Sequence, residues 1–188
     1  LGDVYKRQQR NHLLRRLRQN NSASDAAALV IWDAQVAELG GRVRYRRLVT
    51  VDEVRSFFGT VYHRFAPGGE VAEICYRGPV ECDENALQDE LLQKLQSHRA
   101  RDFQQGYTYC GPQRDDLEFT TNGKAAETYA SEGQLKSILI AWKMAEVYYL
   151  EKCSGDQPVL LLDDLFSELD EHRVEELLEL IDEFEQVL

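Results

Sequence analysis

The sequence lacks several features that would place it in a specialised class of protein. Its 188 residues include only four prolines and four cysteines, and the composition excludes collagen-like and disordered classes. The cysteines form no Cys-x-x-Cys pair, and the four histidines are not spaced from them as zinc ligands are. We therefore expect a reduced, cytoplasmic setting. No apolar run approaches the roughly 18 to 20 residues of a membrane-spanning helix, and no secretory signal is recognised.

A phosphate-binding loop is also absent from the sequence. No segment matches Gly-x-x-x-x-Gly-Lys-Ser/Thr, and Gly123-Lys124 lacks both the upstream glycine and the following hydroxyl residue. We therefore expect that this chain alone does not cradle the phosphates of a nucleotide and does not hydrolyse ATP.

Charge is unevenly distributed along the chain. The formal net charge is −11, yet residues 1–50 carry 10 basic and 4 acidic side chains, whereas residues 151–188 carry 2 basic and 13 acidic ones. Clustered cations are what contact with nucleic-acid phosphates requires. The alternative is a solvated surface or a face that docks a protein partner. The candidate DNA-binding residues are Arg10, Arg15, Arg16, Arg18, Arg42, Arg44, Arg46 and Arg47.

Residues 1–105 are predicted to form a helical arm domain, and its first 65 or so residues include few that suit a compact core. Polar residues 20–24 and the pair Gly40-Gly41 are expected to separate its first three helices. The apolar spacing predicts helices over 5–19, 25–39 and 43–65, a strand over 70–77 and a helix over 84–105.

Residues 106–188 are predicted to form an α/β lobe, because a helix followed by a buried strand is typical of that class. The four aliphatic residues 159–162 suit a strand that is buried on both faces of a parallel sheet. Asn122-Gly123 favours a tight hairpin turn. In order, we expect strands over 107–110, 117–120 and 125–129, a helix over 131–152, the strand over 159–162, a helix over 171–184 and the start of a strand at 186–188.

Two short segments carry residue types that suit nucleotide chemistry. Ser131-Glu132-Gly133-Gln134 begins a long helix, where free N–H groups favour an anion and Gly133 permits close approach of a phosphate. Asp163 and Asp164 follow the predicted buried strand, as in a Walker B site, where one acid holds Mg²⁺ and the next orients or deprotonates water. Each segment alone also fits an ordinary helix cap or strand end. Their order, with Asp163 29 residues after Gln134, is typical of an ABC-type ATPase lobe.

Three ordered motifs resemble those of the RecF family, bacterial recombination and gap-repair ATPases related to SMC and Rad50 heads. They are GPQRDDLEF at 111–119, ASEGQ at 130–134 and LLLDDLFSELD at 160–170, and the resemblance extends over about residues 9–188. It implies an α/β fold, namely the C-terminal lobe of an ABC-type (P-loop NTPase) head with an attached helical arm. In this family the P-loop lies in an N-terminal segment.

The resemblance assigns roles to individual residues. Ser131, Gly133 and Gln134 match the signature motif, which contacts the γ-phosphate of ATP held by the other protomer of a dimer. Family members usually have His where Gln113 stands and Gln where Glu132 stands, and Glu132 adds a negative charge near a phosphate contact.

The last motif supplies the remaining candidate residues. Asp163 matches the acid associated with Mg²⁺, and Asp164 matches the catalytic carboxylate. Ser167 and Asp170 match the D-loop, which lies across the dimer interface, and are candidates for contact with the nucleotide.

The resemblance implies a DNA-binding ATPase for recombinational gap repair, replication restart and the SOS response. Its expected cofactors are ATP and Mg²⁺, and its expected partners are single-stranded and gapped duplex DNA, RecR, RecO and a second copy in an ATP-dependent homodimer. No membrane partner is expected. The alternatives are a catalytically inert module that docks DNA or protein, and the head half of a Rad50-like or SMC-like protein, which the short arm without sustained heptads disfavours.

Overall fold

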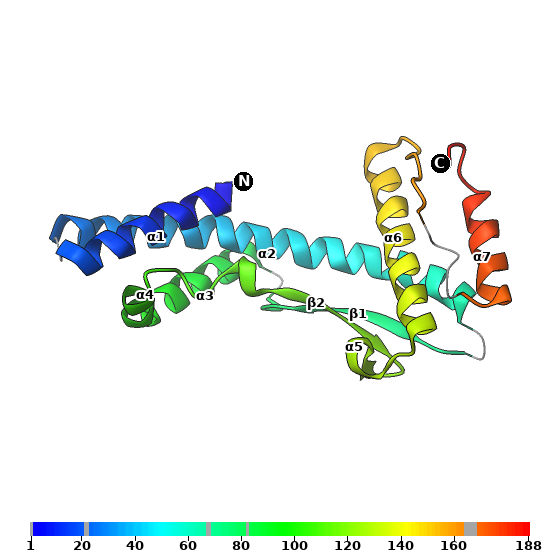
Figure 1. Ribbon diagram of the computed structural model, residues 1–188. Helices are drawn as coiled ribbons and strands as arrows, with labels where there is room; N and C mark the ends of the chain where they lie inside the picture. Colours follow the sequence, from blue (N-terminus) through cyan, green and yellow to red (C-terminus); the bar gives the residue numbers. More distant parts are fainter. Residues whose placement is uncertain (1, 21–22, 67–68, 82, 164–168) are drawn as a thin grey trace. The chain divides into compact units, whose positions relative to one another are not determined.

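The computed structural model describes residues 2–20, 23–66, 69–81, 83–163 and 169–188 (Figure 1). It divides into two compact units that are discontinuous in sequence. Unit 1 is Leu1–Val49 with Tyr76–Asp116, and unit 2 is Thr50–Cys75 with Leu117–Leu188. The expected boundary between residues 105 and 106 is therefore not where the compact units divide.

The helices and strands mostly follow the order expected from the sequence. Among the described residues, none of the helices has both the length and the apolar character needed to cross a membrane. The strands form one sheet in the order β1-β2-β3. The elements are α1 (Gly2–Asn20), α2 (Ala23–Phe65), β1 (Ala72–Arg77), α3 (Glu84–Ser97), α4 (Arg99–Gln105), the 3₁₀ turn η1 (Pro112–Arg114), β2 (Asp116–Thr121), β3 (Lys124–Ala125), α5 (Ala126–Tyr129), α6 (Glu132–Ser154) and α7 (Glu171–Ile181).

The predicted helix break at Gly40-Gly41 is wrong, because α2 runs without interruption through both glycines. In unit 1 they lie against α3. A Cβ atom at Gly40 would lie 2.4 Å from Leu91 Cδ2, and one at Gly41 would lie 2.8 Å from the backbone N and Cα of Gln88. The glycines therefore permit close helix packing instead of ending a helix.

Unit 1 also has a core that the sequence reading did not anticipate. Leucines of α1 and α2 form one buried cluster, and α2 and α3 form a second. The expectation that the first 65 or so residues include few that suit a compact core is therefore wrong. The clusters are Leu13, Leu14, Leu17 and Leu29, and Val36, Ala37, Leu91 and Leu95.

The strand predicted over 107–110 does not form. The Thr108 N–H donates to Asn11 Oδ1 at 2.7 Å, and the Tyr109 N–H donates to Asp102 Oδ1 at 3.0 Å. Because side chains accept both hydrogen bonds, these N–H groups are not available for a strand ladder.

The Asn-Gly turn of unit 2 forms as predicted. Asn122 has φ 48° and Gly123 has φ 75°, the left-handed conformations that a tight hairpin turn requires. The antiparallel pairing of β2 with β3 places Thr121 opposite Lys124. The returning strand is shorter than expected, since α5 begins at Ala126.

The aliphatic segment 159–162 is paired with the end of the chain but is not buried on both faces. Leu160 forms a parallel bridge with Val187, and the Leu162 N–H donates to the Leu188 carbonyl at 2.8 Å. This pairing confirms the expected strand start at 186–188. Leu160 is only 5% exposed, whereas Leu161 is 76% exposed, so the face of the segment that carries Leu161 is not covered by the described residues.

Aromatic and charged side chains position α6 and α7 within unit 2. The Phe119 ring lies 5.8 Å from the Phe58 ring and 5.6 Å from the Trp142 ring, so α2, β2 and α6 share one core. Arg64 of α2 pairs with three acids of the C-terminal segment, Glu176 and Glu179 of α7 and Glu183 after it. These contacts hold α7 against the end of α2.

The two glycine environments of α2 give a matched test of this packing. We expect Gly41→Ala to lower the free energy of unfolding by about 1–3 kcal/mol, because the new Cβ atom collides with the α3 backbone. Gly59 has no heavy atom within 4 Å of its Cβ position, so Gly59→Ala should raise that free energy by roughly 0.5–1 kcal/mol through helix propensity. Urea denaturation followed by circular dichroism measures both, and similar shifts for the two variants would contradict the packing.

Candidate functional site

The N-terminus of α6 is closed by a reciprocal pair of hydrogen bonds. Ser131 Oγ accepts from the Gln134 N–H at 3.2 Å, and Gln134 Oε1 accepts from the Ser131 N–H at 2.8 Å. This capping box leaves the N–H groups of Glu132 and Gly133 to other acceptors. Together with the helix dipole, these groups make the start of α6 favourable for an anion.

The Gln134 amide is also engaged on its other side. Gln134 Nε2 donates to Glu70 Oε1 at 2.7 Å, and the Tyr62 hydroxyl donates to Glu70 Oε2 at 3.2 Å. Burial raises the pKa of the Tyr62 phenol, and the nearby Glu70 carboxylate raises it further, so Tyr62 remains a hydrogen-bond donor at neutral pH. One N–H of Gln134 Nε2 is used by Glu70, and the second N–H of the same amide remains for a phosphate.

Arg173 is a residue of this site that the sequence reading missed. Its Nη1 atom lies 2.9 Å from the position that a Cβ atom at Gly133 would occupy. The space beside Gly133, which we expected to receive a phosphate, is therefore taken by a guanidinium. The spacing of Asp170 and Arg173 at the start of a predicted helix was the only sequence signal for this contact.

Asp170 holds Arg173 in this position. Asp170 Oδ1 accepts from the Arg173 N–H at 3.0 Å as the cap of α7, and Oδ2 accepts from Arg173 Nη1 at 2.7 Å. Hydrogen bonding from the Arg173 backbone is the main cause that lowers the pKa of the Asp170 carboxyl. Within unit 2, Asp170 is thus linked through one side chain to the signature glycine.

The predicted Walker B acids are only partly visible. Asp163 is exposed at the end of segment 159–162, and Asp164 and Ser167 lie outside the described residues. Where the structure describes the chain, no three His, Cys, Asp or Glu side chains are grouped to hold a metal ion. In nucleotide sites Mg²⁺ commonly uses one or two carboxylates together with waters and phosphates, so Asp163 fits a magnesium ligand of that kind.

Two of the arginines predicted to contact DNA are buried, so the prediction is wrong for these two residues. Arg10 is fully buried and pairs with Asp33 and Asp102 at 2.6 and 2.7 Å. Arg44 makes two hydrogen bonds, of 2.9 and 3.0 Å, with the Asp115 carboxylate. Since a buried cation needs its counter-ion, neither side chain is available to a phosphate.

The other predicted arginines are exposed in unit 1. Three of them are engaged within the chain: Arg16 pairs with Asp25, Arg42 pairs with Glu38 and Glu84, and Arg47 donates to the Pro112 carbonyl. The Arg42 pairs are surface contacts, which are weak and exchangeable. The exposed set is Arg15, Arg16, Arg18, Arg42, Arg46 and Arg47.

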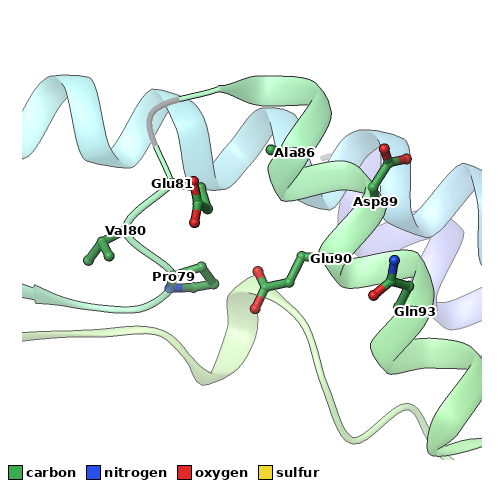
Figure 2. Close-up of a pocket in the computed structure, with 7 residues that line it drawn as sticks. All are labelled: Pro79, Val80, Glu81, Ala86, Asp89, Glu90 and Gln93. Carbon is green, nitrogen blue, oxygen red and sulfur yellow. The ribbon is translucent and has the colours of Figure 1, made fainter.

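A pocket of about 570 Å³ in unit 1 contains none of the predicted site residues (Figure 2). Figure 2 shows that it is formed by the segment after β1 and by α3, with the Glu90 carboxylate directed toward Pro79. Three carboxylates in its lining oppose the binding of a nucleotide phosphate. The lining residues are Pro79, Val80, Glu81, Ala86, Asp89, Glu90 and Gln93.

The capped signature helix and the D-loop acid are features of an ABC-type ATPase lobe, here with an attached helical arm. No family model matches the chain. The chain is 37% identical over 179 residues to the DNA replication and repair protein RecF of Enterococcus faecalis, covering 93% of the chain and 48% of that relative. It is 38% identical over 168 residues to RecF of Geobacter metallireducens, covering 88% of the chain and 44% of that relative.

A solved structure gives the same result. The recombination mediator protein RecF with ATP, from the RecFOR pathway, superposes with a TM-score of 0.87 at 29% identity, covering 100% of this chain and 50% of that one. The chain is therefore related to RecF. The prediction of an α/β lobe with a helical arm is confirmed. The chain spans about half the length of the RecF proteins it matches.

The burial of Arg10 leads to a stability prediction. Arg10→Met should lower the free energy of unfolding by about 3–5 kcal/mol, because it leaves the buried Asp33 and Asp102 without this cation. Arg42→Met removes exposed ion pairs to Glu38 and Glu84 and should cost about 0–1 kcal/mol. Urea denaturation of the two variants distinguishes these values, and equal losses would show that the Arg10 pairs do not stabilise unit 1.

Proposed function

We propose that the chain supplies the signature and Walker B half of a dimeric ATP site in a RecF-like DNA-binding ATPase. Its role would be in recombinational gap repair, replication restart and the SOS response in the cytoplasm. The observation that carries the proposal is the start of α6, where Ser131, Gly133 and Gln134 lie together with Arg173 and Asp170. The relationship to RecF supports it.

The residues of this chain have distinct roles in the proposed site. Ser131, Gly133 and Gln134 would face the γ-phosphate of ATP held by a second copy in an ATP-dependent homodimer. Arg173 lies beside Gly133 and is paired with Asp170 at 2.7 Å, so its positive charge is shared between that carboxylate and the site to which Glu132 adds a negative charge.

The acids after segment 159–162 would act on the metal and on water. Asp163 would hold Mg²⁺, which when bound neutralises charge on the phosphate oxygens. Asp164 would orient or deprotonate the attacking water, and Ser167 and Asp170 would contact the nucleotide from the D-loop. The phosphate cradle itself must come from a segment that contains a P-loop, because this sequence has none.

DNA binding is assigned to the exposed arginines of α1 and α2. Single-stranded and gapped duplex DNA are the proposed ligands, and RecR and RecO are the proposed protein partners. The long-range field of a chain with net charge −11 opposes DNA. Short-range contacts by Arg15, Arg16, Arg18 and Arg46 must therefore supply the attraction.

A catalytically inert docking module is the second candidate function. One observation favours it: the Gln134 amide already donates to Glu70 within the chain. In that case the arginines would still bind DNA or protein, and the acids after residue 162 would have no catalytic role.

ATP hydrolysis separates the two candidates. We expect no hydrolysis by this chain alone, and Mg²⁺-dependent hydrolysis when a separately produced P-loop segment of a RecF relative and gapped DNA are added. Asp164→Asn should then reduce the rate about 100-fold or more through loss of the general base. Asp156→Asn, a change at an exposed carboxylate outside the three motifs, is the control. Hydrolysis that survives Asp164→Asn would favour the inert module.

DNA binding tests the arginine surface independently of ATP. A variant in which Gln replaces four exposed arginines should bind gapped duplex more weakly. Its log K should also fall less steeply with log salt, by about 0.9 for each lost contact. The four arginines are Arg15, Arg16, Arg18 and Arg46. The control replaces four exposed cations of unit 2, namely Arg55, Lys124, Lys143 and Lys152. Fluorescence anisotropy over a salt series measures both, and equal losses would show a general charge effect without a binding surface.

A further inference from the structure

In unit 1, two arginines that were not among the predicted DNA contacts lie over the ring of Tyr109. The Cζ atom of Arg101, on α4, lies 3.5 Å from the centre of the Tyr109 ring, and that of Arg114, at the end of η1, lies 5.0 Å from it. The His98 ring stacks nearby, with ring centres 6.2 Å apart. We call Arg101, Tyr109 and Arg114 the arginine–tyrosine cluster.

The backbone holds this cluster in place. The Tyr109 N–H donates to the buried carboxylate of Asp102, next to Arg101 on α4. Arg114 Nε donates to the Tyr109 carbonyl at 3.3 Å. Because these contacts already exist without a ligand, the cluster pays little ordering cost when one binds.

Both arginines keep a positive charge that the chain does not neutralise. Arg101 and Arg114 are exposed, and no carboxylate in the described part of the chain lies within ion-pair distance of either. Arg16 and Arg42, by contrast, are paired with acids. The cluster is therefore a local cationic site on a chain of net charge −11.

The geometry also provides a flat surface. The 3.5 Å from Arg101 Cζ to the centre of the Tyr109 ring is the usual distance between stacked planar groups. The Arg101 guanidinium therefore lies against the face of the ring. Arg101 is exposed while it lies on the ring, so its side chain is accessible to a ligand. Unpaired nucleic-acid bases stack on aromatic rings and on guanidinium planes, whereas bases in a duplex already stack on one another.

From this arrangement we infer that the arginine–tyrosine cluster binds unpaired nucleotides, with a base stacked on the Arg101–Tyr109 pair and a phosphate held by Arg114. The inference rests on the proposed DNA-binding function. It adds a separate contact that selects single-stranded over duplex DNA, outside the arginines of α1 and α2.

Binding of oligonucleotides to the full chain tests the inference. Fluorescence anisotropy would compare an oligothymidine of about 15 nucleotides with an abasic strand and a duplex of the same length. We expect Arg101→Gln with Arg114→Gln to weaken oligothymidine binding about fivefold or more and to lower its salt slope by about 0.7, for the one phosphate contact of Arg114. Tyr109→Leu should remove the preference for oligothymidine over the abasic strand.

Matched controls separate stacking and local charge from general effects. Arg55→Gln with Lys143→Gln removes the same charge from exposed positions of unit 2, and thermal unfolding checks that each variant folds. The inference is overturned if the control weakens oligothymidine binding as much as the Arg101 and Arg114 double variant does. It is also overturned if the wild type binds the abasic strand as tightly as oligothymidine. A third contrary result is that an oligoglutamate competes as well as oligothymidine, with the same dependence on Arg101 and Arg114.

The outcome also distinguishes this inference from the proposed function. Duplex binding that depends on Arg15, Arg16 and Arg18 but not on the cluster, without a preference for unpaired bases, would leave the proposed function standing and remove the inference. Binding to neither nucleic acid would remove both.

Discussion

The buried guanidinium of Arg10 is the contact on which unit 1 depends. It joins α1 to Asp33 of α2 and to Asp102 of α4, and all three side chains are fully enclosed. Buried charges are tolerated only when they are paired and hydrogen-bonded, so these helices have one register relative to one another. The same Asp102 fixes the backbone of Tyr109, and the arginine–tyrosine cluster therefore depends on an ion pair far from it in sequence.

In unit 2, side chains of the chain itself already contact the residues of the candidate phosphate site. The groups that match the family's phosphate contacts already have partners: one N–H of the Gln134 amide donates to Glu70, and Arg173 occupies the space beside Gly133. An arriving phosphate must share Gln134 with Glu70 and must either displace Arg173 or share it with Asp170. The affinity of the signature face is thus a difference between internal and external hydrogen bonds and not a property of the motif alone.

Local features of the fold were predictable because neighbouring residues determine them. The Ser131 cap, the Asn122-Gly123 turn and the helical part of the acidic C-terminal segment follow from side chains within a few positions of each backbone group. The errors occur where a distant segment intervenes. Gly40 and Gly41 meet α3, and the segment 107–110 gives its N–H groups to Asn11 and Asp102, which no local pattern indicates.

The candidate site divides in the same way. The sequence by itself determined the order of the motifs, the lack of a P-loop and the residue types at the start of α6, because these are properties of the chain as written. Only the tertiary structure decided that Arg10 and Arg44 are buried counter-ions and that Arg173 lies beside Gly133. The physical reason is that an arginine's role depends on whether a carboxylate or solvent surrounds its guanidinium, and folding alone sets those surroundings.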